Sequence, residues 1–403
     1  MKRPFYKKLI ERIIEGILTL SGGVTSLAVL LIVIFLFKEG FGLFHRSPVA
    51  DGFVLVVNKS NPVNRLDSKT VKRIFDQEIT NWQSITGKND TIILLHLDDI
   101  STYYTEEQIG ANMENLPACI SNITDSISGI IGFVPKTYIA KGFKGKEIKT
   151  ENVKASEFFG GKEWFPTAEP SAQLGILPLL LGTLWVSLGA ILLSLPLGLA
   201  VAIYMAEIAD ERIRRIFKPI IELLAGIPSV IYGFFGLVVL VPLIQKVFNL
   251  PVGETALAGS LILAIMALPT IITIAEDSIR TTPRSMKEAS LALGASRWQT
   301  IYKIVIPYSI SGITAAAILG IGRAIGETMA VLMVTGNAAV IPHSFLEPVR
   351  TIPATIAAEL GESSQGGLHY QALFILGCIL FVMTLAINLT VEYISSRKKL
   401  YKR

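Results

Sequence analysis

The run Gly320-Ile-Gly-Arg-Ala-Ile-Gly-Glu-Thr328 lies inside an apolar stretch long enough to cross a bilayer. Its two charged residues, Arg323 and Glu327, each cost about 2.5–3.5 kcal/mol at the centre of a membrane helix, whereas a leucine returns only a few tenths. Their four-residue spacing predicts both side chains on one helical face, about 6 Å apart. They must therefore face protein or water, either as a buried ion pair that fixes helix packing or as a site for a charged ligand.

The composition around this run is that of a polytopic membrane protein. Of the 403 residues 51% are hydrophobic and only 17% are charged, whereas soluble domains carry about a quarter charged residues. Apolar runs of spanning length occur near residues 17–37, 174–205, 219–245, 256–276, 309–335 and 369–393. The sequence therefore predicts an α-helical polytopic membrane protein with six transmembrane helices.

Basic residues predict how these helices are oriented. Lys and Arg gather before the first run, between the second and third, between the fourth and fifth, and in the C-terminal tail. On the other side, residues 247–255 contain neither, and residues 336–368 contain only Arg350. By the positive-inside rule both termini face the cytoplasm, and the net charge of +5 needs no nucleic acid. The first run exceeds the apolar part of a signal peptide, so we expect an uncleaved helix.

The polar stretch between the first and second runs is too long for a plain loop. Three runs in it read as buried strands: 53–57, 91–95 and 130–134. Residues 68–76 read as a helix with Asp67 or Ser68 as its N-cap. The three strands and the helix predict a small α/β insert outside the membrane. The predicted orientation of the helices places this insert in the periplasm.

The sequence does not indicate catalysis. Cys119 lies in a polar region and Cys378 in an apolar run, so we expect no disulfide between them, and the four histidines lack the spacing of metal ligands. Each Gly-Lys pair fails the P-loop pattern, and no HExxH or GxSxG run occurs. We therefore expect no enzyme, no metal and no cofactor, and any ATP must be hydrolysed by a partner.

The connection between the fourth and fifth runs, residues 277–308, is unusually long. Good helix formers occupy Met286–Leu293, Gly294 ends that helix, and Ser296 can cap the next turn. Apolar residues then recur at helical spacing until Pro307 breaks the pattern. The pattern predicts a helix–turn–helix beneath the membrane that fits a partner's groove, with an amphipathic loop resting on lipid as the alternative.

This connection resembles the EAA loop of ABC importer permeases. The resemblance lies in Glu288-Ala-Ser290, Gly294 and Ile306-Pro307. The third residue of the motif is usually alanine in that family, so Ser290 is a departure. In the family this loop docks the cytoplasmic ATPase subunit. The resemblance implies an ATPase-coupling role for Glu288, Ala289, Gly294 and Pro307.

Two further runs narrow the resemblance to the phosphate importer permeases. They are Glu222–Gly236 and Gly322–Asn337, and the second is nearer the PstC family than its PstA partner. The resemblance covers residues 1–44 and 174–403 and implies the type I ABC importer permease fold. It also implies that Arg323 and Glu327 belong to the translocation pathway for inorganic phosphate. The chemistry agrees, because a guanidinium suits a phosphate oxyanion and a nearby carboxylate could hold the arginine between turnovers.

The resemblance also implies a division of the chain and a set of partners. Residues 1–44 would form a cytoplasmic segment and the first transmembrane helix, residues 45–172 the insert, and residues 173–403 the permease domain with its coupling loop. The partners would be a homologous PstA-like permease, cytoplasmic PstB-like ATPase subunits and a periplasmic PstS-like phosphate-binding protein, assembled in the bacterial inner membrane.

The insert itself resembles part of a phosphate-type periplasmic binding protein. Ser101-Thr102 falls where that family often has a Ser-Gly-Thr phosphate clamp, but the glycine is missing. We therefore favour a docking platform, or a cover over the pore mouth, over phosphate binding by the insert.

Two other functions stay open. A permease for another oxyanion, such as sulfate or molybdate, would share these motifs. A self-contained secondary transporter would usually show an inverted repeat. The sequence shows no convincing repeat, and a secondary transporter would leave the long helical connection unexplained.

Overall fold

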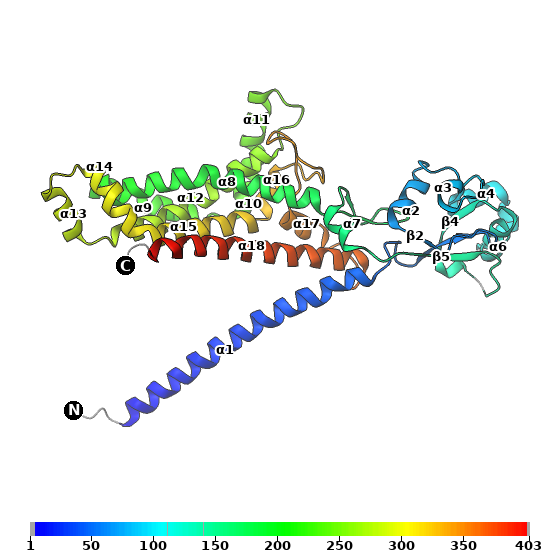
Figure 1. Ribbon diagram of the computed structural model, residues 1–403, viewed down its shortest axis with the longest axis horizontal. Helices are drawn as coiled ribbons and strands as arrows, with labels where there is room; N and C mark the ends of the chain where they lie inside the picture. The colour runs from blue at the N-terminus through cyan, green and yellow to red at the C-terminus, as the bar shows by residue number, and fades with distance from the viewer. Residues whose placement is uncertain (1–4, 111, 140, 401–403) are drawn as a thin grey trace.

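The computed structural model describes residues 5–110, 112–139 and 141–400. A bundle of long helices forms its centre, the insert lies at one end, and α13 (Arg284–Ala292) and α14 (Arg297–Thr300) lie at the other (Figure 1). Six helical stretches among the described residues are long and apolar enough to cross a membrane: Ile14–His45, Leu177–Ile208, Ser229–Phe248, Ala256–Arg280, Arg297–Gly326 and Leu368–Tyr393. The predicted six-helix membrane architecture is confirmed.

The bundle is built around α12 (Ala256–Arg280), which packs against α8 (Leu177–Ile203) and α15 (Ile306–Gly326). Glycine permits the close approach of α12 and α15. A Cβ atom at Gly312 would overlap the Ser278 side chain, and one at Gly320 would lie 2.7 Å from Ile271 Cγ1. The helix α18 (Leu368–Leu400) packs along α15 and against α17 (Ile352–Glu359).

The third predicted span begins later than the hydropathy pattern indicated. Its first residues belong to a separate helix, α9 (Glu211–Ala225), and the chain turns at Gly226-Ile-Pro228. The span proper is α10 (Ser229–Phe235), continued by π-helical η5 (Gly236–Leu240) and α11 (Val241–Phe248). Proline disfavours helical backbone in the residue before it, which accounts for a break rather than a kink.

The fifth predicted span is shifted toward the N-terminus. The helix continues from α14 through π-helical η6 (Ile301–Val305) into α15, so the predicted break at Pro307 is wrong. Proline is tolerated there because it lies in the first turn of α15, after a change of hydrogen-bond pattern. At its other end α15 stops at Gly326, and a short helix, α16 (Met329–Val334), follows.

The insert contains a five-stranded sheet in the order β2-β5-β1-β4-β3. The strands are β1 (Phe53–Val57), β2 (Arg65–Leu66), β3 (Ile93–Leu95), β4 (Ile130–Pro135) and β5 (Lys146–Thr150). β1 pairs antiparallel with β4 and β5, whereas β2 runs parallel to β5 and β3 to β4. Three of these strands are predicted by their apolar runs. β5 is not, because Ile148 is the only fully buried side chain in it.

Two helices pack on this sheet. The first, α2 (Ser68–Phe75), is capped by Asp67, which accepts a hydrogen bond from the Thr70 amide at 3.3 Å, as predicted. The second is α6 (Leu116–Ser126). The remaining short elements are η1 (Gly42–His45), α3 (Gln83–Thr86), η2 (Leu97–Asp99), α4 (Ile100–Tyr103), α5 (Glu106–Ile109), η3 (Lys136–Tyr138), α7 (Ala155–Gly160), β6 (Trp164–Phe165), β7 (Gln173–Leu174) and π-helical η4 (Tyr204–Ile208).

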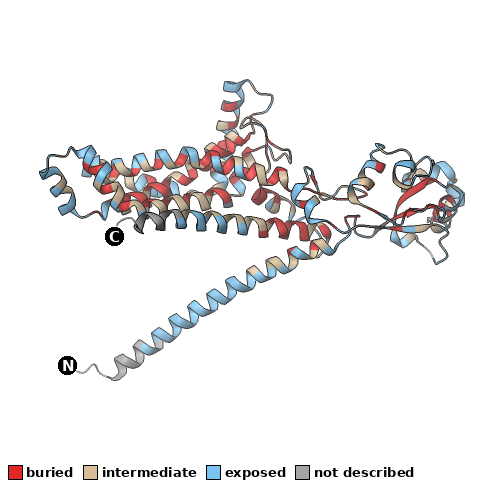
Figure 2. Cartoon of the chain, viewed as in Figure 1, coloured by how far each residue is buried: buried red, intermediate tan, exposed pale blue. Residues whose placement is uncertain are grey.

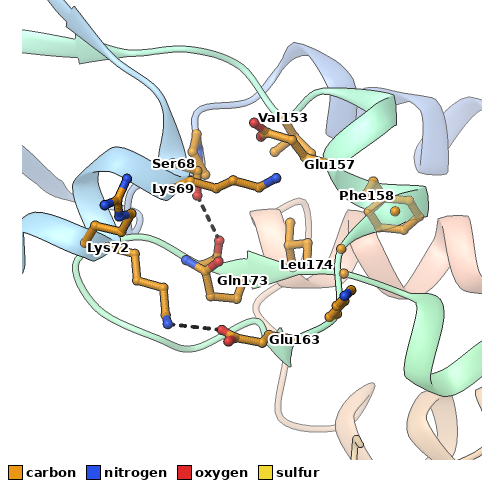
Figure 3. A pocket seen from close by; sticks show the side chains of 16 residues that line it. Ser68, Lys69, Lys72, Val153, Glu157, Phe158, Glu163, Gln173 and Leu174 are labelled. Carbon is orange, nitrogen blue, oxygen red and sulfur yellow. Dashed lines mark hydrogen bonds and ion pairs between the residues drawn. The ribbon is translucent and has the colours of Figure 1, made fainter. Parts of the chain in front are cut away.

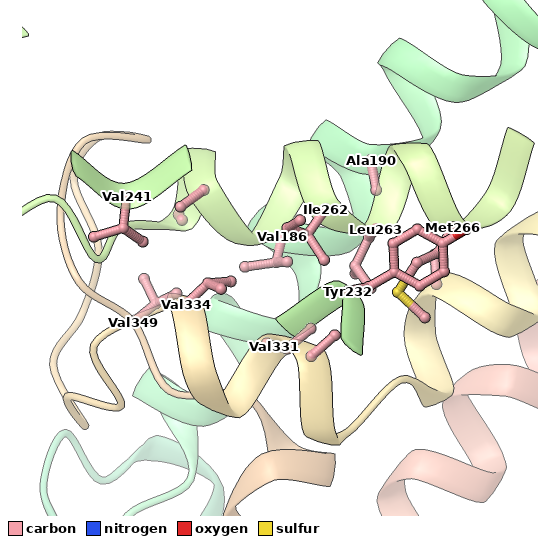
Figure 4. Close-up of a cluster of buried hydrophobic side chains, with 14 of the residues drawn as sticks. Val186, Ala190, Tyr232, Val241, Ile262, Leu263, Met266, Val331, Val334 and Val349 are labelled. Atoms are coloured by element: carbon pink, nitrogen blue, oxygen red, sulfur yellow. The ribbon is translucent and has the colours of Figure 1, made fainter. Parts of the chain in front are cut away.

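Buried residues concentrate in the bundle and in the sheet, whereas most of α1 (Phe5–Phe41) is exposed (Figure 2). α1 meets α18 near the insert and then diverges from the bundle (Figure 1). A cluster of buried apolar side chains joins α8, α10, α12 and α16, with Val186, Tyr232, Ile262 and Val331 facing one another (Figure 4). Cys119 and Cys378 are both free, as predicted.

Candidate functional site

Arg323 lies in the last turn of α15, where this helix meets α10 and α12. Its Nη1 atom donates a hydrogen bond to Thr270 Oγ1 of α12 at 3.2 Å, and Thr270 directly follows Pro269 inside that helix. Tyr232 of α10 lies within electrostatic range of the guanidinium. Arg323 is half-buried, and its neighbour Ala324 belongs to the apolar cluster of Figure 4. The charge is thus hydrogen-bonded to α12 and lies within electrostatic range of α10.

Glu327 does not share a helical face with Arg323. Its backbone is extended, with φ −71° and ψ 135°, because α15 ends at Gly326. Among the described residues no ion pair joins the two side chains. The predicted i,i+4 geometry is therefore wrong, and so is the buried-ion-pair alternative. Glycine weakens a helix, and Gly326 interrupts it before the fourth residue is reached.

The guanidinium consequently keeps most of its hydrogen-bonding capacity. Arginine has five N–H donors, and in the described part of the chain the one hydrogen-bond acceptor of Arg323 is a neutral hydroxyl. Gly322 and Gly326 flank it, and a Cβ atom at either would meet no other atom within 4 Å. A partly unpaired guanidinium suits an oxyanion, which accepts two parallel hydrogen bonds from it.

The Glu222–Gly236 run folds beside this arginine as a helix break. The Tyr232 hydroxyl donates to the Leu224 carbonyl at 2.8 Å, across the turn at Gly226-Ile-Pro228. A carbonyl freed by a break inside a membrane needs another donor, and Tyr232 supplies it. The Tyr232 bond spans the break from α10, the helix that also places Tyr232 within electrostatic range of Arg323.

The residues of the α12–α15 connection, 281–305, form the predicted helix–turn–helix. Gly294 has φ +85°, a left-handed conformation that favours glycine, and it ends α13. The Ser296 hydroxyl accepts from the Gln299 amide at 3.2 Å and caps α14. Glu288, Ala289 and Gly294 are exposed together, whereas Pro307 lies apart from them, half-buried at the start of α15.

Large apolar side chains are exposed on the same connection. Leu293 is 90% exposed, and Trp298 and Tyr302 are exposed as well. Leu293 lies before the fifth span, and Trp298 and Tyr302 lie in its first turns. Exposed apolar side chains of this kind are typical of a site that contacts protein or membrane.

A second polar site, missed by the sequence analysis, lies where the insert meets the bundle. Glu359 Oε1 accepts from Arg350 Nη1 at 2.6 Å, and Glu359 Oε2 accepts from Trp164 Nε1 at 3.1 Å. His369 Nε2 lies 2.9 Å from Glu359 Oε2. We call these four residues the Glu359 junction. Burial alone would raise the pKa of Glu359, but the bonds from His369 and Trp164 and the charge of Arg350 outweigh it and lower the pKa.

A cavity of about 350 Å³ lies between α2 and the segment from α7 to β7 (Figure 3). Four basic side chains line it: Lys69, Lys72, Arg73 and Lys162. Lys72 Nζ lies 3.2 Å from both Asp76 Oδ2 and Glu163 Oε2, and these bonds raise the pKa of Lys72. Arg73 pairs with Glu78. Carboxylates thus pair with two of the four basic side chains, Lys72 and Arg73.

The predicted clamp position of the insert is equally unsuited to an anion. The Ser101 and Thr102 hydroxyls donate to the backbone carbonyls of Asp98 and Asp99, at 2.9 and 2.6 Å. The two aspartates bring negative charge beside them. This arrangement favours the interpretation of the insert as a platform or cover.

Comparison with known proteins shows what kind of protein this is. The family model for the inner membrane component of binding-protein-dependent transport systems matches residues 194–400, more than half of the chain. The chain belongs to this family. The matched range contains Arg323, Glu327 and the whole α12–α15 connection. A second model, for a PBP superfamily domain, matches residues 34–164, which include the sheet of the insert.

Individual relatives agree with the family assignment. The chain is 40% identical to the probable ABC transporter permease protein YqgH of Bacillus subtilis, over 64% of this chain and 84% of that protein. It is 39% identical to the phosphate transport system permease protein PstC of Mesorhizobium japonicum, over 60% and 78%. Among solved structures, the inward-facing MetNI methionine ABC transporter aligns with 56% of this chain and 94% of its own, at 19% identity and a TM-score of 0.42. The family match and the six apolar helices together make the chain a multi-pass inner-membrane transport subunit.

Proposed function

We propose that this chain is the permease subunit of an ATP-driven importer that carries inorganic phosphate across the inner membrane by alternating access. The observation that carries the proposal is Arg323, a half-buried guanidinium in an apolar span with one neutral hydrogen-bond partner. Such a group binds an oxyanion well. The relatives named as phosphate transport permeases support phosphate as that oxyanion.

Glu327 has a separate role in this proposal. It follows the end of α15, so a small change at Gly326 would bring its carboxylate toward or away from Arg323. With phosphate bound, the carboxylate stays away from the guanidinium. After release it moves in and holds the arginine until the next cycle.

The energy comes from partner ATPase subunits that dock on the α12–α15 connection. Glu288, Ala289 and Gly294 belong to the exposed docking surface, and Pro307 supports its base at the start of α15. Binding of ATP moves this connection, and the attached helices rock so that Arg323 faces the two sides of the membrane in turn.

The complete importer would contain four kinds of subunit. This chain pairs with a homologous PstA-like permease, two PstB-like ATPase subunits act in the cytoplasm, and a PstS-like binding protein delivers phosphate from the periplasm. In this arrangement both termini are cytoplasmic and the insert is periplasmic, which places it beside the binding protein.

The proposal is tested by uptake of labelled phosphate into vesicles that contain the reconstituted complex. Arg323→Gln should lower uptake about 100-fold, which corresponds to the loss of strong charge-assisted hydrogen bonds, while the complex still assembles. Lys246→Gln, on the exposed face of α11, is the matched control. Normal uptake by Arg323→Gln would contradict the proposed role of the arginine. Competition by sulfate or molybdate, but not by phosphate, would assign another oxyanion.

A further inference from the structure

The helix α13 is held to the rest of the protein by few side chains. Of its nine residues seven are exposed, and only Lys287 and Ser290 are half-buried. Residues three apart lie on the same helical face. α13 therefore has one inner face, made of two polar side chains, and presents the rest of its surface outward.

The two inner side chains make different contacts. Ser290 Oγ lies 3.0 Å from Thr300 Oγ1, so this contact stays within the α12–α15 connection. Lys287 Nζ forms an ion pair with Glu207 Oε1, and Glu207 belongs to η4, the π-helical end of the α8 span. Among the described residues this is the one ion pair of α13, and it reaches the membrane bundle.

The ion pair is shielded from water. The Lys287 and Glu207 side chains are 23% and 11% exposed. Attraction between charges is stronger where water is partly excluded, and leaving one of them alone is costly there. The pair is therefore a firmer link than an exposed surface salt bridge.

Glu207 belongs to η4, and packed helices connect η4 with Arg323. η4 packs against α12, and the neighbouring Ala206 lies against the buried cluster that contains Ala275 of α12 and Val305 of η6. α12 also carries Thr270, the hydrogen-bond partner of Arg323. Packed elements thus connect α13 to the candidate anion site.

We propose that the Lys287–Glu207 ion pair is the positioning contact that transmits the displacement of α13 to α8 and α12, and so couples ATP hydrolysis to anion transport. The inference rests on the proposed function. The outer face of α13 binds the ATPase, and the inner face passes the movement to the helices. Lys287 and Glu207 act through these helices and do not touch the transported anion.

The test measures phosphate uptake and ATP hydrolysis in the same vesicles that contain the full importer. Lys287→Glu or Glu207→Lys should leave ATP hydrolysis in place and lower the phosphate carried per ATP about tenfold, a usual size for a contact between coupled residues. The reversed pair, Lys287→Glu with Glu207→Lys, should restore the ratio to within about twofold. Lys246→Glu, an exposed lysine of α11 outside this connection, is the control and should leave the ratio unchanged.

Two results would overturn the inference: single variants that stay fully coupled, or a reversed pair that is no better than either single variant. A single variant that does not assemble is replaced by Lys287→Met or Glu207→Gln, and the same ratio decides. If the unaltered complex carries sulfate or molybdate instead, the ratio is measured with that anion. If the unaltered complex shows no ATP-driven uptake, the proposed function fails, and this inference fails with it.

Discussion

The two ends of the helix bundle are attached to their neighbouring elements in opposite ways. At the insert end, Glu359 joins side chains from three other segments, and Trp164 and Phe158 are buried in one cluster with residues of α8 and α18. At the other end α13 is mostly exposed and has one ion pair. The insert is therefore firmly attached to the bundle, whereas α13 of the α12–α15 connection is attached by few contacts.

Strand pairing also joins the insert to the chain segment that leads into the membrane helices. β6 of the insert pairs with β7, and Trp164 lies opposite Leu174. Trp164 is 1% exposed, so its large apolar surface is removed from water at the insert end of the bundle. The insert therefore contacts α17 and α18 directly.

The strongest test of the fixed end is Glu359→Ala. It leaves Arg350, His369 and Trp164 without their common acceptor, and the loss of one partner from a shielded ion pair costs about 3–5 kcal/mol. We expect the apparent unfolding temperature of the purified protein to fall by about 10 °C. Glu362→Ala, on a nearby exposed carboxylate, should leave it unchanged. A fall no larger than that of the control would mean that the insert is loosely attached.

Gly294→Val tests the exposed end. Its φ of +85° costs a β-branched residue about 1–2 kcal/mol, and no other atom lies close enough to resist a new side chain. We expect about tenfold weaker binding of the partner ATPase, measured by co-purification, with the unfolding temperature of the chain little changed. Gly294→Asn should bind normally, because asparagine tolerates this conformation. Equal weakening by both variants would show that size, not backbone conformation, matters there.

The pH dependence separates the charge of the Glu359 junction from its packing. The pKa of Glu359 in the folded protein lies below its ordinary value of 4.5, so its carboxylate contributes stability above that pH. The contribution is lost as the pH falls through the lower folded value. The difference in unfolding temperature between the unaltered protein and Glu359→Gln should therefore shrink below about pH 4.5. A difference that stays constant down to pH 3 would assign the effect to packing alone.

Local patterns were sufficient to find the six membrane helices, though not the bounds of the third and fifth, and to find two helix caps. Apolar runs located all six spans, and Asp67 and Ser296 cap helices as their residue types and positions indicated. The end of α15 was missed because apolar residues continue beyond it into α16, so a hydropathy window does not register the break at Gly326. The prediction that Arg323 and Glu327 share a helical face was wrong for that reason.

The contacts that distinguish the two ends could not be predicted from local patterns. Trp164 and Glu359 lie 195 residues apart, and Lys287 and Glu207 lie 80 apart, so only the folded bundle brings them together. One signal was present in the sequence. Arg350 is the only lysine or arginine in residues 336–368, and a lone arginine in such a segment points to a carboxylate partner.

The smallest effect on the unfolding temperature is expected for Lys72→Met in the insert. This variant compares exposed ion pairs with the shielded ones of the Glu359 junction. Lys72 has two carboxylate partners at 3.2 Å, about as close as those of Glu359, but its side chain is 35% exposed and theirs are 49% exposed. Water screens such pairs, which contribute about 0–1 kcal/mol. We expect the unfolding temperature to change by less than about 2 °C. Glu163→Gln removes the charge of the carboxylate that pairs with Lys72. It should therefore change the unfolding temperature equally little. If either variant destabilises the protein as much as Glu359→Ala, distance rather than burial determines the strength of these ion pairs, and the insert end owes its rigidity to more than the Glu359 junction.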